Sequence, residues 1–522
     1  MDFSAPLSIV PSHFCGYEAW EHKLVKIDSN IEFVQFLQDS MINKSIEMVS
    51  SDIIEFLSKR SEFVTLILPA LKYFVSQTSS LFPAPIYPFK PHKIALKEEF
   101  RDEIKCVPEF FLPVFGSDIE TILLKQWSFS KQQTICLVCH MFCCSFPFVF
   151  NVDEVCGFNR YWECIKYPSA QAHLTMAMDY IKLCFLSPTY ISDPTSIQIN
   201  RVLLCDSLFS TFISSLKDHR FHLKHFNVLD ELICGAFDRP LSTLIFHHDG
   251  YIGCYECPSD VELDFAHRSI GYGPFATQEE IVFGTMPEAC IAPLVNTSMS
   301  DSEACCIRGT THIGQGIGYA KSYKYKGVHG DISREWIELQ SHSPEQFVLH
   351  SVPTDYIDKK TLRHPSIMCV DAKCYGYEDS LKCQVGDIHR DLQKYMCGIL
   401  ASMLSVQLSE CHEHPPELKS KTPTYDGKPV EFSQINSLGT GPWGCGVYGG
   451  DKQLKLCIQV LGSSYFKVKC LHYFTFGEKK IQDQWDMWRG KHNITSAGKL
   501  FEILENYKKY VKHGGKKQIF EF

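Results

Sequence analysis

Two adjacent glutamates, Glu279 and Glu280, follow Gln278 and a short turn that contains Gly271 and Gly273. Glutamate and aspartate, like histidine, serve as general acids and bases in catalysis. Glycine has no Cβ, so it lets the backbone approach a ligand closely. The residue types and their spacing therefore indicate proton-transfer chemistry on a ligand that a loop holds by its main chain.

A simpler interpretation of the glutamate pair competes with this one. The apolar residues Ile281, Val282 and Phe283 come next and predict a helix that begins near Gln278. Acidic residues are common in a first helical turn because they complement the helix dipole. Taken alone, the pair favours this structural role, whereas the glycine turn and a third carboxylate upstream, Asp264, favour a site.

A second glycine-rich stretch, WGCGVYGGD, matches the pattern G-x-G-x-x-G at Gly444, Gly446 and Gly449. A dinucleotide-binding fold needs a strand before this motif and an acidic residue about 20 positions after it. The preceding INSLGTGPW does not resemble a strand, and SSYFKVK stands where the acid is expected, which argues against that fold. A glycine-rich loop that leads into a helix also exposes backbone N–H groups that can hold a phosphate. A plain tight turn is the alternative.

The stretch CLVCH, with Cys136, Cys139 and His140, has the pattern of c-type haem attachment, and Cys254 and Cys257 form another C-x-x-C pair. Because the residues around the first pair repeat with helical spacing, we interpret it as a buried helix in which cysteine serves as a small hydrophobe. We therefore expect no metal and no cofactor.

The composition is that of a globular protein: 522 residues, 45% hydrophobic and 21% charged. The net charge of −9 offers no global attraction for a polyanion, so we expect no sequence-specific nucleic-acid binding, and local groups must hold any phosphate. The start shows no secretory leader, so the 24 cysteines predict reduced thiols in an intracellular protein. The most apolar early run, FVTLILPALKYFV, is too short to span a bilayer and contains Lys72, so we expect no membrane segment.

The sequence pattern predicts that residues 1–235 form a mainly helical accessory region. Ser130 and Gln133 form a capping-box pattern before one helical face, and apolar residues from Leu174 to Phe185 repeat the helical spacing.

From residue 236 the pattern changes to short β-rich runs, LSTLIF, VELDFA, SIMCVDA and VKCLHYFTF, separated by helical stretches. This alternation predicts an α/β layer fold for residues 236–522. A polar, proline-rich stretch near 412–430 predicts a surface insertion.

The order of these motifs resembles that of the poly(ADP-ribose) glycohydrolase family. DFAHRSIGYGPFATQEE is similar to the family's Asp-Phe-Ala-Asn, triple-glycine and Gln-Glu-Glu signature. GYAKSYKY, IMCVDA, LQKYMCGIL, WGCGVYGGD and YFTFG follow in the family's order, and SKQQTICLVCHMFCCSFP resembles its core helix. The match runs from about 120 to 510 and is absent from roughly the first hundred residues.

The resemblance implies a macrodomain, which is a mixed sheet with helices on both faces, preceded by a helical accessory domain. It also implies hydrolysis of ribose–ribose O-glycosidic bonds in poly(ADP-ribose), with release of ADP-ribose and without a metal or cofactor. The implied partners are poly(ADP-ribose) and poly(ADP-ribosyl)ated proteins, within the DNA damage response, in the nucleus and/or cytoplasm.

By the same resemblance, Glu280 protonates the leaving ribose and then activates water, as glycosidases do around an oxocarbenium-like transition state. Glu279 would orient ribose hydroxyls, and Asp264 would support the catalytic loop or the ribose. The implied substrate-binding residues are Gln278, His267, Gly271, Gly273, Ile252, Tyr323, Gly446, Val447, Tyr448, Gly449 and Phe476. Residues 446–449 would hold the diphosphate, Tyr448 and Phe476 would pack near the ribose, and Tyr323 with Ile252 would contact adenine.

Several departures from the family pattern cluster at the expected site. Tyr272 replaces the middle glycine, where its side chain would block the pocket or line it. His267 and Pro442 replace asparagines, Lys321 replaces a common glutamate, and the loop before Gln278 is shorter than usual. Three functions therefore compete: an active glycohydrolase, a degenerate module that binds ADP-ribose, and a hydrolase that acts on single ADP-ribose units on proteins.

Overall fold

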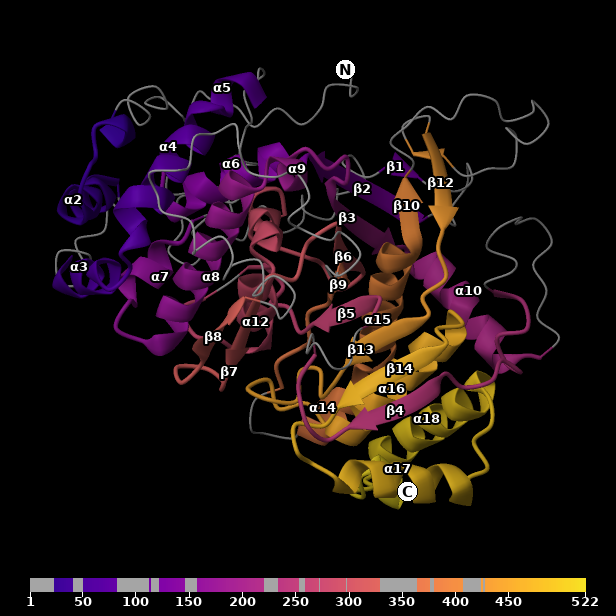
Figure 1. Ribbon diagram of the computed structural model, residues 1–522. Coiled ribbons are helices and arrows are strands. Elements are labelled where there is room, and N and C mark those ends of the chain that lie inside the picture. Colours follow the sequence, from indigo (N-terminus) through magenta and orange to yellow (C-terminus); the bar gives the residue numbers. More distant parts are fainter. Residues whose placement is uncertain are drawn as a thin grey trace, which may run out of the picture.

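The structure is a computed structural model (Figure 1), and none of the helices it describes is long and apolar enough to cross a membrane. It describes residues 23–40, 50–81, 112–113, 122–145, 157–219, 233–252, 259–271, 273–296, 298–328, 364–375, 380–406, 424–425 and 428–522.

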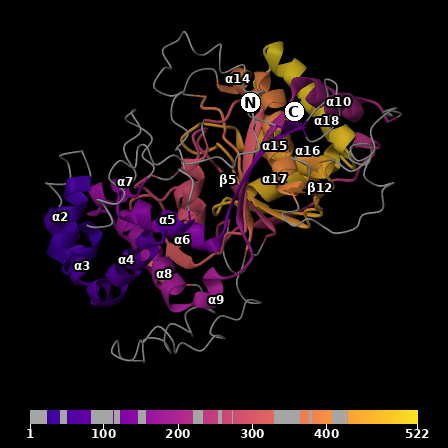
Figure 2. The same cartoon turned by 90° about the horizontal axis from the view of Figure 1, so that it is seen from above.

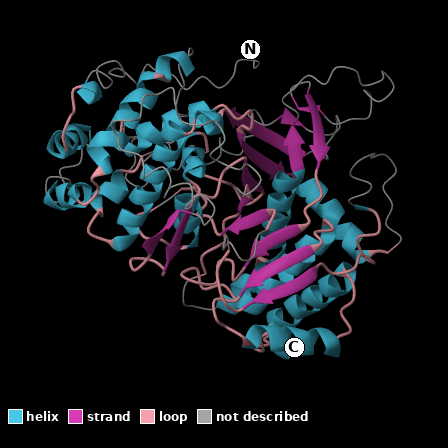
Figure 3. Ribbon diagram, in the orientation of Figure 1, coloured by secondary structure: helices cyan, strands magenta, loops and turns pink. Residues whose placement is uncertain are grey.

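In these ranges a nine-stranded mixed sheet forms the centre of the protein, with the order β1-β2-β3-β6-β9-β5-β13-β14-β4 (Figure 3). In that order the strands are Leu112–Pro113, Ile122–Phe129, Ile197–Leu204, Glu303–Arg308, Ser366–Cys369, Val261–Asp264, Ser437–Thr440, Cys470–Phe474 and Thr243–His247. Neighbours from β1 to β9 pair antiparallel, and neighbours from β9 to β4 pair parallel. Parallel neighbours need crossover connections, which helices usually supply.

Helices cover both faces of the sheet because alternate residues of a strand point to opposite sides. On β6, Ala304 and Cys306 pack into the core of one face, whereas Cys305 and Ile307 pack into the core of the other. The first face carries α10 (Asp206–Lys217), α15 (Ile388–Met403), α16 (Lys452–Tyr465) and α18 (Ala497–Lys512), and the second carries α6 (Lys131–Phe142), α8 (Pro168–Leu186), α12 (Gln278–Thr285) and η6 (Pro287–Leu294). Figure 2 shows the N-terminal and C-terminal helices on opposite sides of the sheet.

Smaller elements extend these layers. They are α2 (Asn30–Ser40), α3 (Ser50–Ser58), η3 (Phe63–Ile67), α4 (Leu68–Ser76), α5 (Thr78–Leu81), α7 (Asn159–Glu163), α9 (Pro188–Ile191), β7 (Gly314–Ile317), β8 (Lys324–Val328), α14 (Ser380–Gly386), β10 (Leu404–Val406), β11 (Thr424–Tyr425), β12 (Lys428–Phe432), α17 (Lys480–Lys491) and η8 (Ile519–Glu521). Strands β7 and β8 form a hairpin, and β10, β12 and β11 form a small separate sheet.

Most of the predicted elements are confirmed. Ser130 and Gln133 form the predicted capping box at the start of α6, and the predicted helix from Leu174 lies within α8. The four β-rich runs overlap β4, β5, β9 and β14, and helices on both faces of one sheet confirm the α/β class.

The sheet begins earlier in the chain than the sequence predicts. Strands β2 and β3 lie before residue 236, in the region predicted to be mainly helical, yet they belong to the same sheet. Most residues of β3 are buried, so IQINRVLL lacks the clean alternation of a half-exposed strand.

Two further expectations concern the strand before the glycine-rich loop and the insertion near 412–430. β13 directly precedes the glycine-rich loop, so the expectation that no strand stands there is wrong. Its residues are mostly buried on both faces, which removes the alternation that marks a strand in a sequence. The predicted insertion near 412–430 lies outside the described residues, except for β11 and part of β12.

Candidate active site

Loops from four neighbouring parallel strands meet at one edge of the sheet. β5 ends at Asp264, β13 at Thr440, β14 at Phe474 and β9 at Cys369, shortly before Asp371. Because the strands are parallel, their carboxyl ends lie on the same edge, where open α/β sheets bind their ligands. The glutamate pair and the glycine-rich loop, which are far apart in the sequence, are therefore brought to one edge.

The start of α12 is tied to β5 by Gln278. Its Oε1 accepts the backbone N–H of Phe265 at 2.6 Å, and its Nε2 donates to the carbonyl of Leu263 at 2.8 Å. Both ends of this amide are used inside the protein. Gln278 therefore positions α12. The sequence predicts that this residue contacts the substrate, but in the structure its amide is bound to β5 and the segment after it.

Glu279 faces inward and holds the loop that precedes α12. Its Oε2 accepts the N–H of His267 and its Oε1 accepts the N–H of Gly271, both at 3.0 Å. Burial raises the pKa of Glu279 well above its usual range, and the carboxyls of Asp264 and Glu280 add to the shift, whereas the two N–H donors oppose it. Glu279 thus anchors the loop, and its contact with ribose hydroxyls stays a prediction.

Glu280 is less buried than Glu279 and lies at the N-terminal turn of α12. Its Oε1 accepts the N–H of Gly273 at 3.2 Å, and its Oε2 accepts the N–H of Thr277 at 2.9 Å and the Thr277 hydroxyl. Burial raises the pKa of Glu280, and the Thr277 and Gly273 donors oppose the shift. A carboxyl that keeps its proton closer to neutral pH suits a general acid.

The N–H groups of Gly271 and Gly273 therefore point to the two glutamates and not to a ligand. Because both N–H groups are already used, these glycines could contact a substrate only through their Cα atoms, which a ligand can approach closely in the absence of a Cβ. Tyr272, between them, lies outside the described residues.

Asp264 is the third carboxyl and is completely buried. Within the described residues neither of its oxygens accepts a backbone N–H, and the Cys369 thiol beside it is a weak donor. Burial raises the pKa of Asp264 to about 8, and the carboxylate of Glu280 adds to the shift. Burial raises the pKa of Asp264, Glu279 and Glu280 alike, so these three neighbouring carboxyls do not carry three charges at neutral pH.

The loop between β13 and α16 exposes its backbone to solvent, with Val447 95% exposed. Within the described residues the N–H groups of Gly446, Val447 and Tyr448 have no acceptor. The sequence predicts that the N–H of Gly449 also faces the ligand. In the structure it donates to the Gly446 carbonyl at 3.0 Å, so it is not open. Consecutive open N–H groups just before a helix form an anion-binding surface.

Gln384 of α14 holds this loop in place, and the loop lies close to the two glutamates. Gln384 donates to the Gly449 carbonyl at 3.1 Å and accepts the Asp451 N–H at 2.5 Å. Gly444 has φ +69° and stands against Ala372, where a Cβ would overlap the Ala372 methyl group. Burial raises the pKa of the Tyr448 phenol, and the charges of both glutamates add to the shift.

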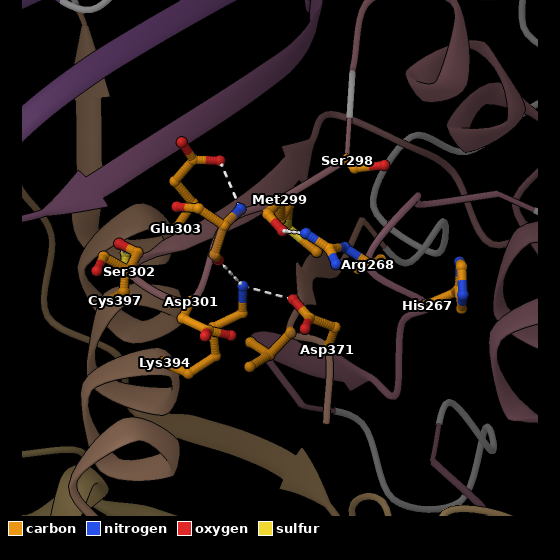
Figure 4. Close-up of polar contacts among 12 residues, drawn as sticks. His267, Arg268, Ser298, Met299, Asp301, Ser302, Glu303, Asp371, Lys394 and Cys397 are labelled. Carbon is orange, nitrogen blue, oxygen red and sulfur yellow. Dashed lines mark hydrogen bonds and ion pairs between the residues drawn. The ribbon is translucent and has the colours of Figure 1, made fainter. Parts of the chain in front are cut away.

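A charged network fixes the segment after β5 from the other side (Figure 4). Lys394 donates to the Ser300 carbonyl at 2.5 Å and pairs with Asp371. The N–H of Met299 donates to the carbonyl of Arg268 at 2.7 Å. The side chain of His267 projects away from this network and is exposed, so it is open to a ligand.

The predicted adenine contacts are not available in this structure. Tyr323 is 1% exposed and stacks on His173 with ring centroids 5.8 Å apart, so its ring has no open face for a base. Ile252 is 2% exposed and packs with Phe474. Both residues belong to the packing beneath the site.

A tyrosine that the sequence predictions missed lies at the rim. Tyr319 is 50% exposed, and burial together with the nearby Glu280 carboxylate raises its pKa. Phe476, in the loop after β14, is 47% exposed and has φ +51°, and its contact with the ribose stays a prediction. GYAKSYKY contains three tyrosines, and only their burial distinguishes Tyr319 from Tyr323.

The haem-like stretch lies on α6 in the core, as the buried-helix interpretation predicts. His140 contacts the Thr78 hydroxyl at 2.8 Å and the Ser145 hydroxyl at 2.6 Å, and burial lowers its pKa to about 4. No cluster of three or more metal-ligating side chains occurs in the part of the chain that the structure describes. Cys254 and Cys257 lie outside that part.

Comparison of the sequence with known proteins relates part of this chain to one family. Residues 234–483 match the family described as poly(ADP-ribose) glycohydrolase (PARG), macrodomain fold. This part of the chain belongs to the poly(ADP-ribose) glycohydrolase family. The predicted family and the predicted macrodomain fold are thereby confirmed.

Two relatives show how far the similarity reaches. Poly(ADP-ribose) glycohydrolase 1 of Arabidopsis thaliana is 27% identical over 274 residues, which cover 47% of this chain and 48% of the relative. Poly(ADP-ribose) glycohydrolase 1 of Caenorhabditis elegans is 25% identical over 250 residues, which cover 47% of this chain and 27% of the relative. The chain thus matches about half of the first relative's length and less of the second's, and the family match leaves out β2, β3, α6 and α8.

Proposed function

We propose that the protein is a poly(ADP-ribose) glycohydrolase, which hydrolyses ribose–ribose O-glycosidic bonds and releases ADP-ribose. The observation that carries the proposal is the pairing of Glu280, whose pKa is raised by burial, with a nearby loop of open N–H groups. Membership of residues 234–483 in the glycohydrolase family supports it. The partners would be poly(ADP-ribose) and the proteins that carry it.

In this mechanism Glu280 gives its proton to the oxygen that bridges two riboses while the bond from that oxygen to the anomeric carbon breaks. The positive charge that develops on the sugar is stabilised by the neighbouring carboxylate of Glu279. The Glu280 carboxylate then takes a proton from water, and the water oxygen bonds to the anomeric carbon. The first half-reaction deprotonates Glu280 and the second protonates it again, so the two together return it to its starting state, and no metal takes part in either.

The remaining residues suit the parts of ADP-ribose. The N–H groups of Gly446, Val447 and Tyr448 would bind the diphosphate, because they are consecutive, open and followed by the N-terminus of α16. Tyr319 and Phe476, each about half exposed, would contact the adenosine moiety.

One observation favours a second function, an ADP-ribose-binding module that does not cleave the polymer. Both glutamates already accept hydrogen bonds from their own loop, and Pro442 supplies neither the amide side chain nor the backbone donor of an asparagine. In that case the loop at 446–448 would still bind a diphosphate, but Glu280 would not reach the bridging oxygen.

The experiment is to incubate the protein with labelled poly(ADP-ribose) and, separately, with a protein that carries single ADP-ribose units. Each incubation is repeated with Glu280→Gln and with Glu502→Gln, a control for the loss of an exposed carboxylate. Release of ADP-ribose from the polymer by the wild type and Glu502→Gln, but not by Glu280→Gln, supports the glycohydrolase. Tight binding without release by any of the three indicates the binding module. Release only from singly modified protein indicates a hydrolase of single units.

A further inference from the structure

Helix α8, which lies before the family match, contacts the catalytic loop at two points. The Ser169 hydroxyl donates to the carbonyl of Pro274 at 2.8 Å, and Nε2 of His173 contacts the carbonyl of Glu280 at 2.9 Å. Ser169 and His173 are four residues apart, so they lie on the same face of α8. This face lies beside α12 and β8 (Figure 1).

The ring of His173 is held in one orientation. It stacks on Tyr161 with centroids 4.8 Å apart at an interplanar angle of 14°, and on Tyr323 with centroids 5.8 Å apart at 21°. Gly284 of α12 leaves the space that the ring fills, because a Cβ there would lie 2.8 Å from Nε2. Burial lowers the pKa of His173 to about 4, so at neutral pH the imidazole is uncharged and its one N–H is available to the Glu280 carbonyl.

We propose that His173 is a positioning residue for Glu280, so that α8, outside the matched region, completes the active site. The carbonyl that His173 contacts belongs to the residue that carries the acid, and Ser169 fixes the turn that leads to it. Displacing a catalytic group by about 1 Å can lower the rate about 100-fold. A contact that holds the backbone of Glu280 in place can therefore affect the rate. The inference rests on the proposed glycohydrolase function for its kinetic test.

A purely structural role would give a different result, and the chain offers a matched control. His140 on α6 is also buried, also has a pKa lowered to about 4, and also contacts polar partners, but these belong to α5 and to the segment just after α6. Replacing either histidine by phenylalanine removes a buried hydrogen-bonding ring and keeps an aromatic one. Only His173 contacts the residue that carries the acid.

The experiment compares His173→Phe, His173→Gln, Ser169→Ala and His140→Phe in the full chain. Glutamine places an N–H donor close to the position of Nε2. Two quantities are measured: kcat and KM on poly(ADP-ribose), and hydrogen exchange of the backbone amides of Gly271, Gly273 and Thr277. Ser169→Ala is the milder variant should His173→Phe not fold.

We expect His173→Phe to lower kcat by about 10- to 100-fold with KM little changed, and to speed exchange of these amides. We expect His173→Gln to recover part of both losses, Ser169→Ala to show a smaller change, and His140→Phe to leave both at wild-type values. Equal changes in His140→Phe and His173→Phe, or none in His173→Phe, would overturn the proposal. If the wild type shows no turnover, the glycohydrolase function fails, and amide exchange alone decides the role of His173.

Discussion

The burial of Asp264 makes a definite prediction about how stability depends on pH. The pKa of this carboxyl is 3.8 without perturbation and about 8 in the folded protein, because it is buried without backbone donors. The folded state therefore binds the proton more tightly than the unfolded chain. Its contribution to stability is fully present below pH 4 and is lost as the pH rises to about 8.

The size of the effect follows from the shift. When the folded protein holds one proton more than the unfolded chain, the free energy of unfolding falls by about 1.4 kcal/mol per pH unit, so Asp264 lowers stability by at most about 4 kcal/mol between pH 5 and 8. Asp264→Asn keeps the shape of the side chain and removes the proton equilibrium. We therefore expect the variant to show a flatter dependence over this window and to be the more stable protein at its upper end.

The assay is urea unfolding of the wild type and Asp264→Asn at each pH unit from 5 to 8. Asp179 provides a control with a different window, since burial raises its pKa to about 6. Asp179→Asn should flatten the curve only below about pH 6. Parallel curves for the wild type and Asp264→Asn from pH 5 to 8 would show that Asp264 is ionised in the folded protein, and the assignment of a proton to Asp264 at neutral pH would then have to be abandoned.

Three further outcomes are expected. Val447→Pro, which removes one open N–H, should weaken ADP-ribose binding by about 10- to 100-fold in calorimetry, whereas Val447→Ala should leave the affinity nearly unchanged because that side chain is 95% exposed. Tyr319→Ala should weaken ADP-ribose binding without lowering the melting temperature, and Tyr323→Ala should destabilise the fold by about 3–5 kcal/mol; the opposite pattern would return the base contact to Tyr323. Gly284→Ala should cost about 1–3 kcal/mol in urea unfolding because its Cβ meets the His173 ring, and wild-type stability would contradict that packing.

The sequence predicts the location of the site better than the direction of its side chains. The Gln-Glu-Glu turn with the strand before it, and the glycine-rich loop with the helix after it, are found at the predicted positions, because turn residues and apolar periodicity act locally. Whether Gln278 points to a ligand or back to β5 depends on atoms from a distant strand, which local patterns do not report.

Burial on both faces explains most of the remaining differences. VELDFA alternates apolar and polar residues, yet all four residues of β5 are buried, including Glu262 and Asp264. The same double coverage hides β3 and β13 from a search for alternation. The contact of His173 with Glu280 joins segments that no sequence motif connects, so only the structure reveals it.

The most direct test of the central claim is a single-turnover measurement on poly(ADP-ribose) with Glu280→Gln, paired with calorimetric binding of ADP-ribose to the same variant. Loss of a general acid should slow bond cleavage by about 100- to 10,000-fold, while the affinity for ADP-ribose stays within a few-fold of the wild type. Cleavage at the wild-type rate would show that another group delivers the proton, and a parallel loss of affinity would show that Glu280 binds the ligand and does not protonate it.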